Sequence, residues 1–171
     1  MKTALLIFLP EVHGKTNSRL QLCRHKMVKT HNCLVKFSNG LNSTDMTYVT
    51  EWYKHGRLAD GFSWPDTIEP GYRDKNGVLS YERNGAVFVG CSGYVTYKMF
   101  DTEVTIAFAN PYRGGNALGV GTGGKRVWDD TSNHKYHEFI VNVDTSGGTF
   151  QFDCRCTHGS TNTCTINITK K

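Results

Sequence analysis

The stretch CSGYVTYKMFDTEVTIAFANP, residues 91–111, decides the fold of this chain. It contains two runs rich in Val, Thr, Tyr and Phe, and within each run apolar and polar residues tend to alternate with a period of two. Such alternation is typical of strands in a sheet that is buried on one face. The sequence therefore predicts two consecutive strands here, joined by a short turn at residues 100–101.

Similar runs lie on both sides of this stretch and end near Gly, Asn or Pro. Upstream they are CLVKF at 33–37, TYVTEWYKHG at 47–56, FSWPDTIEPG at 62–71 and VLSYE at 78–82; downstream they are EFIVNVD at 138–144, TFQFDCRC at 149–156 and TCTINITKK at 163–171. The pair Asn84-Gly85 is a strong signal for a hairpin, because both residues accept a positive φ. Pro65 and Pro70 are expected at strand starts or connections, since proline cannot donate to a central ladder.

Only residues 125–139, KRVWDDTSNHKYHEF, suit a short helix, with Asp129 and Asp130 as its start signal. The composition, 38% hydrophobic and 20% charged, is that of a globular protein, and 171 residues suffice for one domain. We therefore expect an all-β fold, an antiparallel β-sandwich with one or two short flanking helices. The sandwich is expected over residues 31–171, preceded by a poorly defined basic segment over 1–30.

The formal net charge of +5 favours anionic partners such as nucleic acid, acidic glycans or lipid headgroups. The excess is concentrated early in the chain, but no nucleic-acid recognition motif accompanies it, so nucleic acid is not an expected partner. The apolar run from Ala4 to Leu9 is shorter than the roughly 7–15 residues of a signal-peptide core. We expect a protein that is secreted or bound to a target membrane, with storage in the cytoplasm as the alternative.

GVGTGGKRVW, residues 119–128, contains G-x-x-x-x-G-K, which is most of a nucleotide-binding P-loop. A working P-loop also needs a Ser or Thr after the lysine and a helix whose N-terminus faces the phosphates. Arg126 replaces that hydroxyl, and the residues after it show no amphipathic helix. We therefore interpret GVG as the end of a strand and TGGKR as a basic turn. No cofactor is expected.

His134 and His137, with Asp129 and Asp130 upstream, are residue types that bind metals. Structural zinc sites bring four ligands at tight spacings, and no such set occurs here, so no metal site is expected. No G-x-S-x-G motif is present, and the cysteines lie in predicted strands rather than before a helix. The sequence therefore does not predict an enzyme.

Three cysteines near the C-terminus are candidates for pairing. Cys154 and Cys156 share one face of a predicted strand, and Cys164 begins the next strand. Either of the first two can therefore face Cys164, as a buried thiol or as a disulfide partner.

SGYVTYKM at 92–99, VTIAFANPY at 104–112 and ALGVGTGGK at 117–125 resemble strands of the actinoporins and their wider cytolysin and lectin superfamily. That superfamily includes fungal fruit-body lectins and, in looser likeness, the aegerolysins. The likeness covers residues 31–171 as a pattern of elements and is specific between Ser92 and Tyr112. It implies a β-sandwich flanked by helices that binds sphingolipid or phosphocholine headgroups or sugars and, in the toxins, oligomerises into pores.

The resemblance also implies a headgroup site. Pro111 and Tyr112 match its proline and the adjacent aromatic residue, Tyr136 and His137 fall where the family has tyrosines, and Ser92 lies near a serine of the pocket. By residue type, Trp128 adds apolar and π contacts, and basic side chains attract the phosphate oxygens. The candidate site residues are Ser92, Pro111, Tyr112, Arg113, Trp128, Tyr136 and His137, with Lys125 and Arg126 as further cations.

Two departures from the toxins bear on function. Ala109 replaces a serine, and RGGNAL at 113–118 replaces an aromatic loop that enters the membrane interface. The toxins form pores with an amphipathic N-terminal helix, and here Pro10 and Gly14 interrupt any apolar face. Membrane headgroup binding is therefore better supported than perforation.

The alternative function is a carbohydrate-binding lectin on the same fold. It would use the same aromatic side chains, with Asn110, Asn116 and Asp130 as hydrogen-bond partners for the sugar. The expected partners are thus membrane lipid headgroups or glycans, together with further copies of this chain on a membrane.

Overall fold

The computed structural model describes residues 31–81, 89–134 and 137–171. Within them the elements are, in chain order, β1 Asn32–Asn39, β2 Met46–His55, β3 Arg57–Leu58, β4 Thr67–Ile68, β5 Val78–Tyr81, β6 Cys91–Met99, β7 Thr102–Asn110, β8 Ala117–Gly121, α1 Lys125–His134, β9 Glu138–Thr145, β10 Gly148–Cys156 and β11 Thr161–Lys170. The predicted all-β class is confirmed, and one helix, α1, flanks the sheets.

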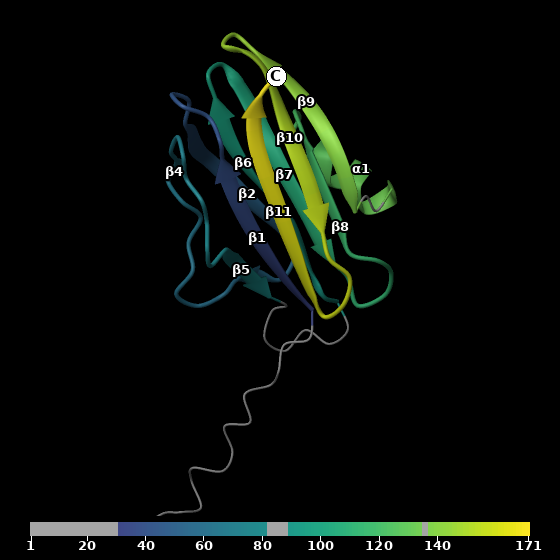
Figure 1. Cartoon of the computed structure of the whole chain (residues 1–171). Coiled ribbons are helices and arrows are strands. Elements are labelled where there is room, and N and C mark those ends of the chain that lie inside the picture. The colour runs from purple at the N-terminus through teal and green to yellow at the C-terminus, as the bar shows by residue number, and fades with distance from the viewer. Residues whose placement is uncertain (1–30, 82–88, 135–136) are drawn as a thin grey trace, which may run out of the picture.

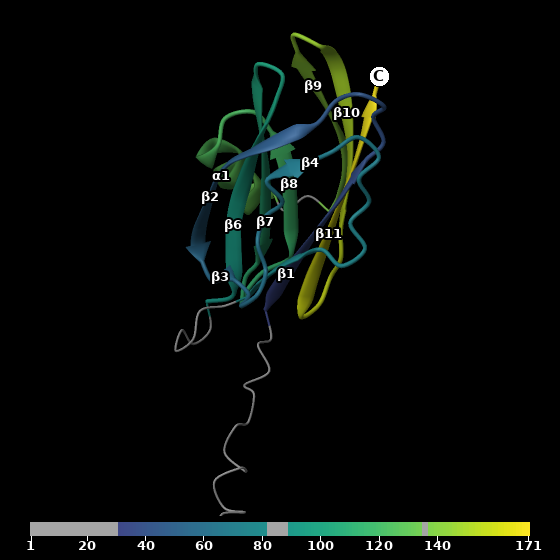
Figure 2. The same cartoon turned by 90° about the vertical axis from the view of Figure 1, so that its left-hand side faces the viewer.

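The strands form two sheets that pack face to face, with α1 outside one of them (Figures 1 and 2). Sheet A has the strand order β3-β5-β1-β11-β10-β9, and sheet B has the order β4-β2-β6-β7-β8. Consecutive hairpins build β6-β7-β8 in sheet B and β9-β10-β11 in sheet A. The segment that holds α1 lies between these two units and carries the chain from one sheet to the other.

One neighbouring pair departs from the predicted antiparallel arrangement. β1 and β11 run parallel, with Asn32 opposite Thr161 and Asn39 opposite Ile168. The hydrophobic pattern determines which face of each strand is buried, but it does not specify the direction of a strand's neighbour. The start and the end of the domain are therefore paired in the middle of sheet A.

The hairpin predicted around Asn84-Gly85 is also corrected. β5 pairs with β1 and β3 in sheet A, whereas β6 pairs with β2 and β7 in sheet B. The two runs thus lie in different sheets and not in one hairpin. The Asn84-Gly85 pair itself lies outside the described residues.

The core lies between the sheets and follows the alternation read from the sequence. In β1, and in β11 as far as Ile168, every second residue is buried and the residues between them are partly exposed. Phe37, Tyr97, Phe108 and Phe152 are among the largest side chains that are almost wholly buried. Phe37 makes edge-to-face contacts with Tyr97 at 5.5 Å and with Trp64 at 6.4 Å between ring centroids.

Helix α1 packs on the outer face of sheet B, against β7 and β8 (Figure 2). Small residues allow this close approach: Gly119 and Gly121 lie in β8, opposite Ala107 and Thr105 of β7. A Cβ atom added at Gly119 would come within 1.7 Å of Thr131 Oγ1. The helix is 10 residues long, and no described helix has the length and apolar character needed to cross a bilayer.

Candidate functional site

The segment with the P-loop-like spacing is a strand, a turn and a helix. The short helix predicted within residues 125–139 is α1, but it begins at Lys125 and not at Asp129 or Asp130, so Lys125 and Arg126 belong to the helix and not to the turn before it. Gly119, however, belongs to β8, pairs with Ala107 and packs under Thr131, so it is not part of a phosphate-binding loop. The backbone N–H of Gly124 donates to Thr105 Oγ1 at 3.1 Å. This geometry ties the turn to the sheet and gives no support to nucleotide binding.

A cleft opens at the end of the sandwich where β1 begins, the lower end in Figure 1. Its volume is about 340 Å³, which is within the roughly 300–1,000 Å³ of small-molecule sites. The β7–β8 loop, the β10–β11 turn and the residue before β1 form its walls. We call it the end cleft; its lining residues are His31, Asn110, Pro111, Tyr112, Gly114, Gly115, Asn116, His158, Gly159 and Ser160.

Two buried asparagines hold the walls of the end cleft together. Asn110 Nδ2 donates to the carbonyl oxygens of Asn32 at 2.8 Å and Ser160 at 2.9 Å. Asn116 Nδ2 donates to the carbonyl oxygens of Thr157 at 2.7 Å and Gly159 at 3.1 Å. These amide N–H groups were predicted to bind a sugar, but they are already engaged in binding the β10–β11 turn. Two of the groups that the lectin hypothesis assigns to sugar binding therefore already donate to the protein's own backbone.

Tyr112 is the exposed aromatic residue of the end cleft, with 42% of its surface accessible. Its ring meets the His31 ring edge-on, with 5.2 Å between the ring centroids. Arg113 follows it in the same loop and is exposed. An aromatic face beside a guanidinium is suited to a ligand that carries both a cationic and an anionic group.

His137 lies next to the end cleft through a histidine pair. Its ring is 4.3 Å from that of His158 between centroids, and its Nδ1 is 3.5 Å from the Sγ of Cys156. Partial burial, and then the neighbouring His158, lower the pKa of His137 below its ordinary value of 6.5. Among the described residues no group of three or more His, Cys, Asp or Glu side chains is arranged to hold a metal ion.

A second aromatic group lies on the outer face of sheet B, away from the end cleft. Trp52 of β2 stacks on Tyr94 of β6 with 5.5 Å between ring centroids, and Trp128 of α1 meets Trp52 edge-on at 5.3 Å. Lys125 Nζ lies 5.6 Å from the Trp128 ring and bonds Asp129 at 2.7 Å. We call Trp52, Tyr94 and Trp128 the aromatic patch.

The seven predicted site residues therefore do not form a single site. Pro111 and Tyr112 line the end cleft, Arg113 continues the same loop, and His137 adjoins it through His158. Trp128 belongs to the aromatic patch. Ser92 lies in β6 opposite Ala109, is only 6% exposed and does not line the end cleft. The prediction for Tyr136 lies outside the described residues.

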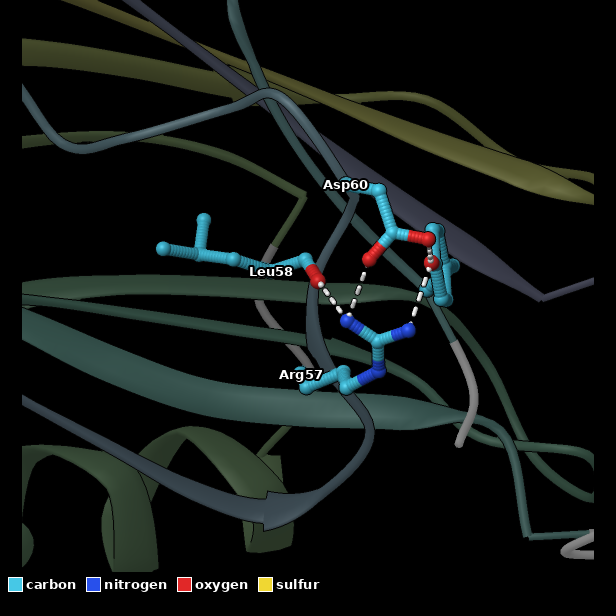
Figure 3. Close-up of polar contacts among 4 residues, drawn as sticks. Arg57, Leu58 and Asp60 are labelled. Carbon is cyan, nitrogen blue, oxygen red and sulfur yellow. Dashed lines mark hydrogen bonds and ion pairs between the residues drawn. The ribbon is translucent and has the colours of Figure 1, made fainter. Parts of the chain in front are cut away.

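Arg57, on the β3–β5 edge of sheet A, is a basic side chain whose partners are internal. Its guanidinium donates to Asp60 Oδ1 at 2.7 Å, to the carbonyl oxygen of Leu58 at 3.3 Å and to the Tyr81 hydroxyl at 3.0 Å (Figure 3). The Tyr81 hydroxyl in turn donates to Asp60 Oδ2 at 3.0 Å. This closed ring of contacts stabilises the edge of the sheet and leaves Arg57 poorly placed to attract an external anion.

Comparison with known proteins adds a relationship of fold. No family model matches the chain, and no curated protein sequence matches it. Among solved structures, the lipid binding protein Nakanori superposes with a TM-score of 0.63 at 15% sequence identity, over 82% of this chain and 71% of Nakanori. The chain shares its fold with a lipid-binding protein.

Two further solved structures share this fold, and one of them is a lectin. A variant of the lectin XCL from Xerocomus chrysenteron matches with a TM-score of 0.53 at 13% identity, over 81% of this chain and 97% of the lectin. The RahU protein matches with a TM-score of 0.50 at 10% identity, over 84% of this chain and 97% of RahU. At these identities the likeness is one of fold, and the functional argument rests on the site itself.

The structure adds four residues that the sequence did not assign to a site. His31 and His158 line the end cleft, and Trp52 and Tyr94 form the aromatic patch. His158 lies in a turn and His31 precedes β1, so neither belongs to a sequence motif. Trp52 lies inside the predicted strand TYVTEWYKHG at 47–56, and its aromatic type near basic residues was the signal that could have placed it on the surface.

Proposed function

We propose that this protein is a non-catalytic binding protein that recognises the headgroup of a membrane lipid in the end cleft. The observation that carries the proposal is the cleft itself, which combines the exposed Tyr112 ring and two histidines within one small-molecule-sized site. The exposed Arg113 follows Tyr112 in the same loop, next to the residues that line the cleft. The fold shared with a lipid-binding protein supports it.

The chemistry of the cleft fits a zwitterionic phosphorylated headgroup. The Tyr112 ring attracts a quaternary or primary ammonium group through its π face. Arg113 provides charge-assisted hydrogen bonds to phosphate oxygens. The glycines at 114 and 115 give the ligand access to the backbone, because no side chain covers it there.

Vesicle co-sedimentation at low salt tests this function. We expect retention on vesicles of sphingomyelin or of its phosphoethanolamine analogue. Tyr112→Ala is expected to weaken retention by about 1–2 kcal/mol, roughly 5- to 30-fold in affinity, because it removes the cation–π face. If the wild-type chain is not retained on either vesicle, headgroup recognition is wrong.

The matched control is Phe62→Ala, which removes an aromatic ring of similar exposure, 39%, that does not line the end cleft. It is expected to bind like the wild type. If Phe62→Ala and Tyr112→Ala lose vesicle retention equally, the loss would come from reduced surface hydrophobicity in general and not from the cleft. Release of an entrapped dye from the same vesicles tests pore formation separately.

A carbohydrate-binding function is the second candidate, and the aromatic patch is the observation that favours it. Trp52 and Trp128 are both partly exposed on one face, and such rings suit ligands that are apolar on one side and wet on the other. A glycan array supports this function if wild-type binding is lost in Trp52→Ala but kept in Tyr112→Ala. An array without signal, beside positive vesicle binding, excludes it.

A further inference from the structure

Five cysteines lie among the described residues, and no disulfide joins any two of them in this structure. Two of them, Cys156 in β10 and Cys164 in β11, are direct partners across the antiparallel ladder. Cys154 is partnered instead with Ile166. Of the two cysteines that the sequence offered as partners for Cys164, the structure therefore selects Cys156.

The hydrogen-bond pattern shows which kind of pair this is. At the next position, the Thr157 N–H donates to the carbonyl oxygen of Thr163 at 3.1 Å. The Cys156 N–H points away from β11, toward the start of β9, and donates to the carbonyl oxygen of His137 at 2.7 Å. Because bonded and non-bonded pairs alternate along an antiparallel ladder, Cys156 and Cys164 form a non-hydrogen-bonded pair.

Such a pair has the spacing that a disulfide requires. Cα atoms in non-hydrogen-bonded pairs are about 4.5 Å apart, and disulfides span Cα separations of roughly 4.4–6.8 Å. Directly opposite residues project from the same face of the sheet, here the face toward the core, where Cys164 is fully buried. Both thiols therefore lie on one side of the ladder, within bridging reach.

The surroundings of Cys156 allow a reagent and a base to reach it. Cys156 is partly exposed, and its Sγ lies 3.5 Å from His137 Nδ1. Burial raises the pKa of Cys156 to about 11, so this thiol needs a proton acceptor before it can attack a disulfide. His137 is suited to that role because its own pKa is lowered, which keeps the imidazole neutral at pH 7.

We propose that Cys156 and Cys164 are a disulfide-forming pair, with Cys156 as the attacking thiol and His137 as its proton acceptor. With glutathione disulfide as the oxidant, the Cys156 proton passes to His137 and the thiolate attacks one glutathione sulfur. A mixed disulfide forms and one glutathione leaves with a proton. The Cys164 thiol then attacks the Cys156 sulfur, and its proton passes to the second glutathione, which leaves as a thiol. Two cysteine thiols are oxidised and one glutathione disulfide is reduced.

The bridge would close the β10–β11 hairpin immediately behind the end cleft. The turn inside the closed loop holds His158, Gly159 and Ser160, which form one wall of the cleft. The disulfide therefore fixes this wall whichever ligand the cleft binds, and it does not depend on the lipid-binding proposal.

Peptide mapping of the full chain tests the proposal. The folded protein is equilibrated with glutathione disulfide, denatured in N-ethylmaleimide and digested with trypsin. Cleavage after Arg155 and Lys170 gives a peptide of residues 156–170 that contains both cysteines and excludes Cys154. We expect this peptide to be two mass units lighter than its reduced form and free of N-ethylmaleimide.

Three variants sharpen the result. Cys154→Ser is the matched control and should still form the bridge, whereas Cys156→Ser should leave Cys164 alkylated. His137→Gln should slow bridge formation several-fold without changing its final extent, which a purely structural role of His137 would not produce. Two N-ethylmaleimide adducts on the wild-type 156–170 peptide, or a cross-link from it to another cysteine, would overturn the assignment.

Discussion

His137 and His158 place two imidazole rings 4.3 Å apart beside the end cleft. The pKa of His137 is lowered, because its ring is partly buried and because a positive charge on the neighbouring His158 would repel a proton there. The same ring also contacts the Cys156 thiol. One histidine thus links the cleft wall, the candidate disulfide and the response of the protein to pH.

The lowered pKa of His137 predicts a loss of stability at mildly acidic pH. Below the ordinary histidine pKa of 6.5, the unfolded chain binds this proton more readily than the folded chain, in which the pKa of His137 is lowered. The stability that neutral His137 contributes to the folded protein is therefore complete above pH 6.5. It declines as the pH falls through the lowered pKa of the folded state. Urea unfolding of the wild type should show a falling free energy of unfolding between about pH 7.5 and 5.5.

His137→Gln removes the titrating group and should flatten this decline. The wild type, measured in parallel over the same pH range, is the control. An unchanged slope in His137→Gln would show that other groups account for the pH dependence.

At the scale of elements, the seating of α1 on sheet B depends on small residues in β7 and β8. Thr131 Oγ1 donates to the Val127 carbonyl within the helix at 2.7 Å and occupies the space above Gly119 where a Cβ would lie. The helix in turn carries Trp128 to its contact with Trp52. The aromatic patch therefore depends on a glycine in a neighbouring strand.

Gly119→Ala should lower the free energy of unfolding by about 1–3 kcal/mol, because overpacking forces the helix away from the strand. Gly121→Ala is the matched control in the same strand: its added Cβ would lie 3.5 Å from Val127 Cγ2, an ordinary contact. Denaturant unfolding of both variants checks the prediction. Equal stability of the two variants would contradict the proposed close approach.

At the scale of the whole molecule, the charge is divided unevenly. Residues 1–30 contain six Lys and Arg against one Glu, whereas residues 31–171 contain 14 basic and 14 acidic residues. The entire net charge of +5 thus belongs to the first 30 residues. They join the domain at His31, which lines the end cleft.

A fragment of residues 31–171 should therefore lose attraction to anionic vesicles but keep headgroup recognition. We expect the full chain to sediment with phosphatidylglycerol vesicles at low salt and to be released as salt screens the charges. The fragment should bind these vesicles weakly, and it should bind sphingomyelin vesicles as the full chain does. Equal retention of fragment and full chain on anionic vesicles would refute the role of the basic segment.

Much of the fold could be predicted because local patterns carry it. The strands of 91–111 and the short helix within 125–139 follow from periodicity and composition. The position of Trp52 could not be predicted, because irregularities in the β2–β6 register between Tyr48 and Thr50, and again between Tyr53 and His55, change which residues face outward. The alternation of apolar and polar residues in the sequence does not indicate where such a bulge occurs.

Part of the candidate site could be predicted because it lies in one continuous stretch of the chain. Pro111, Tyr112 and Arg113 are consecutive, so one motif located all three. His31 and His158 are 127 positions apart in the chain and meet at the end cleft only because β1 lies beside β11. Ser92 is buried within β6 and does not line the cleft, which no local pattern predicts.

The sequence by itself determined the all-β class, the buried face of the main strands and the cluster of positive charge, because periodicity and composition are local properties of the chain. Only the tertiary structure decided that β1 pairs in parallel with β11, that Cys156 faces Cys164 and that Tyr112 shares a cleft with two histidines. These are contacts between distant segments, and the free energy that selects them comes from packing the two sheets as a whole.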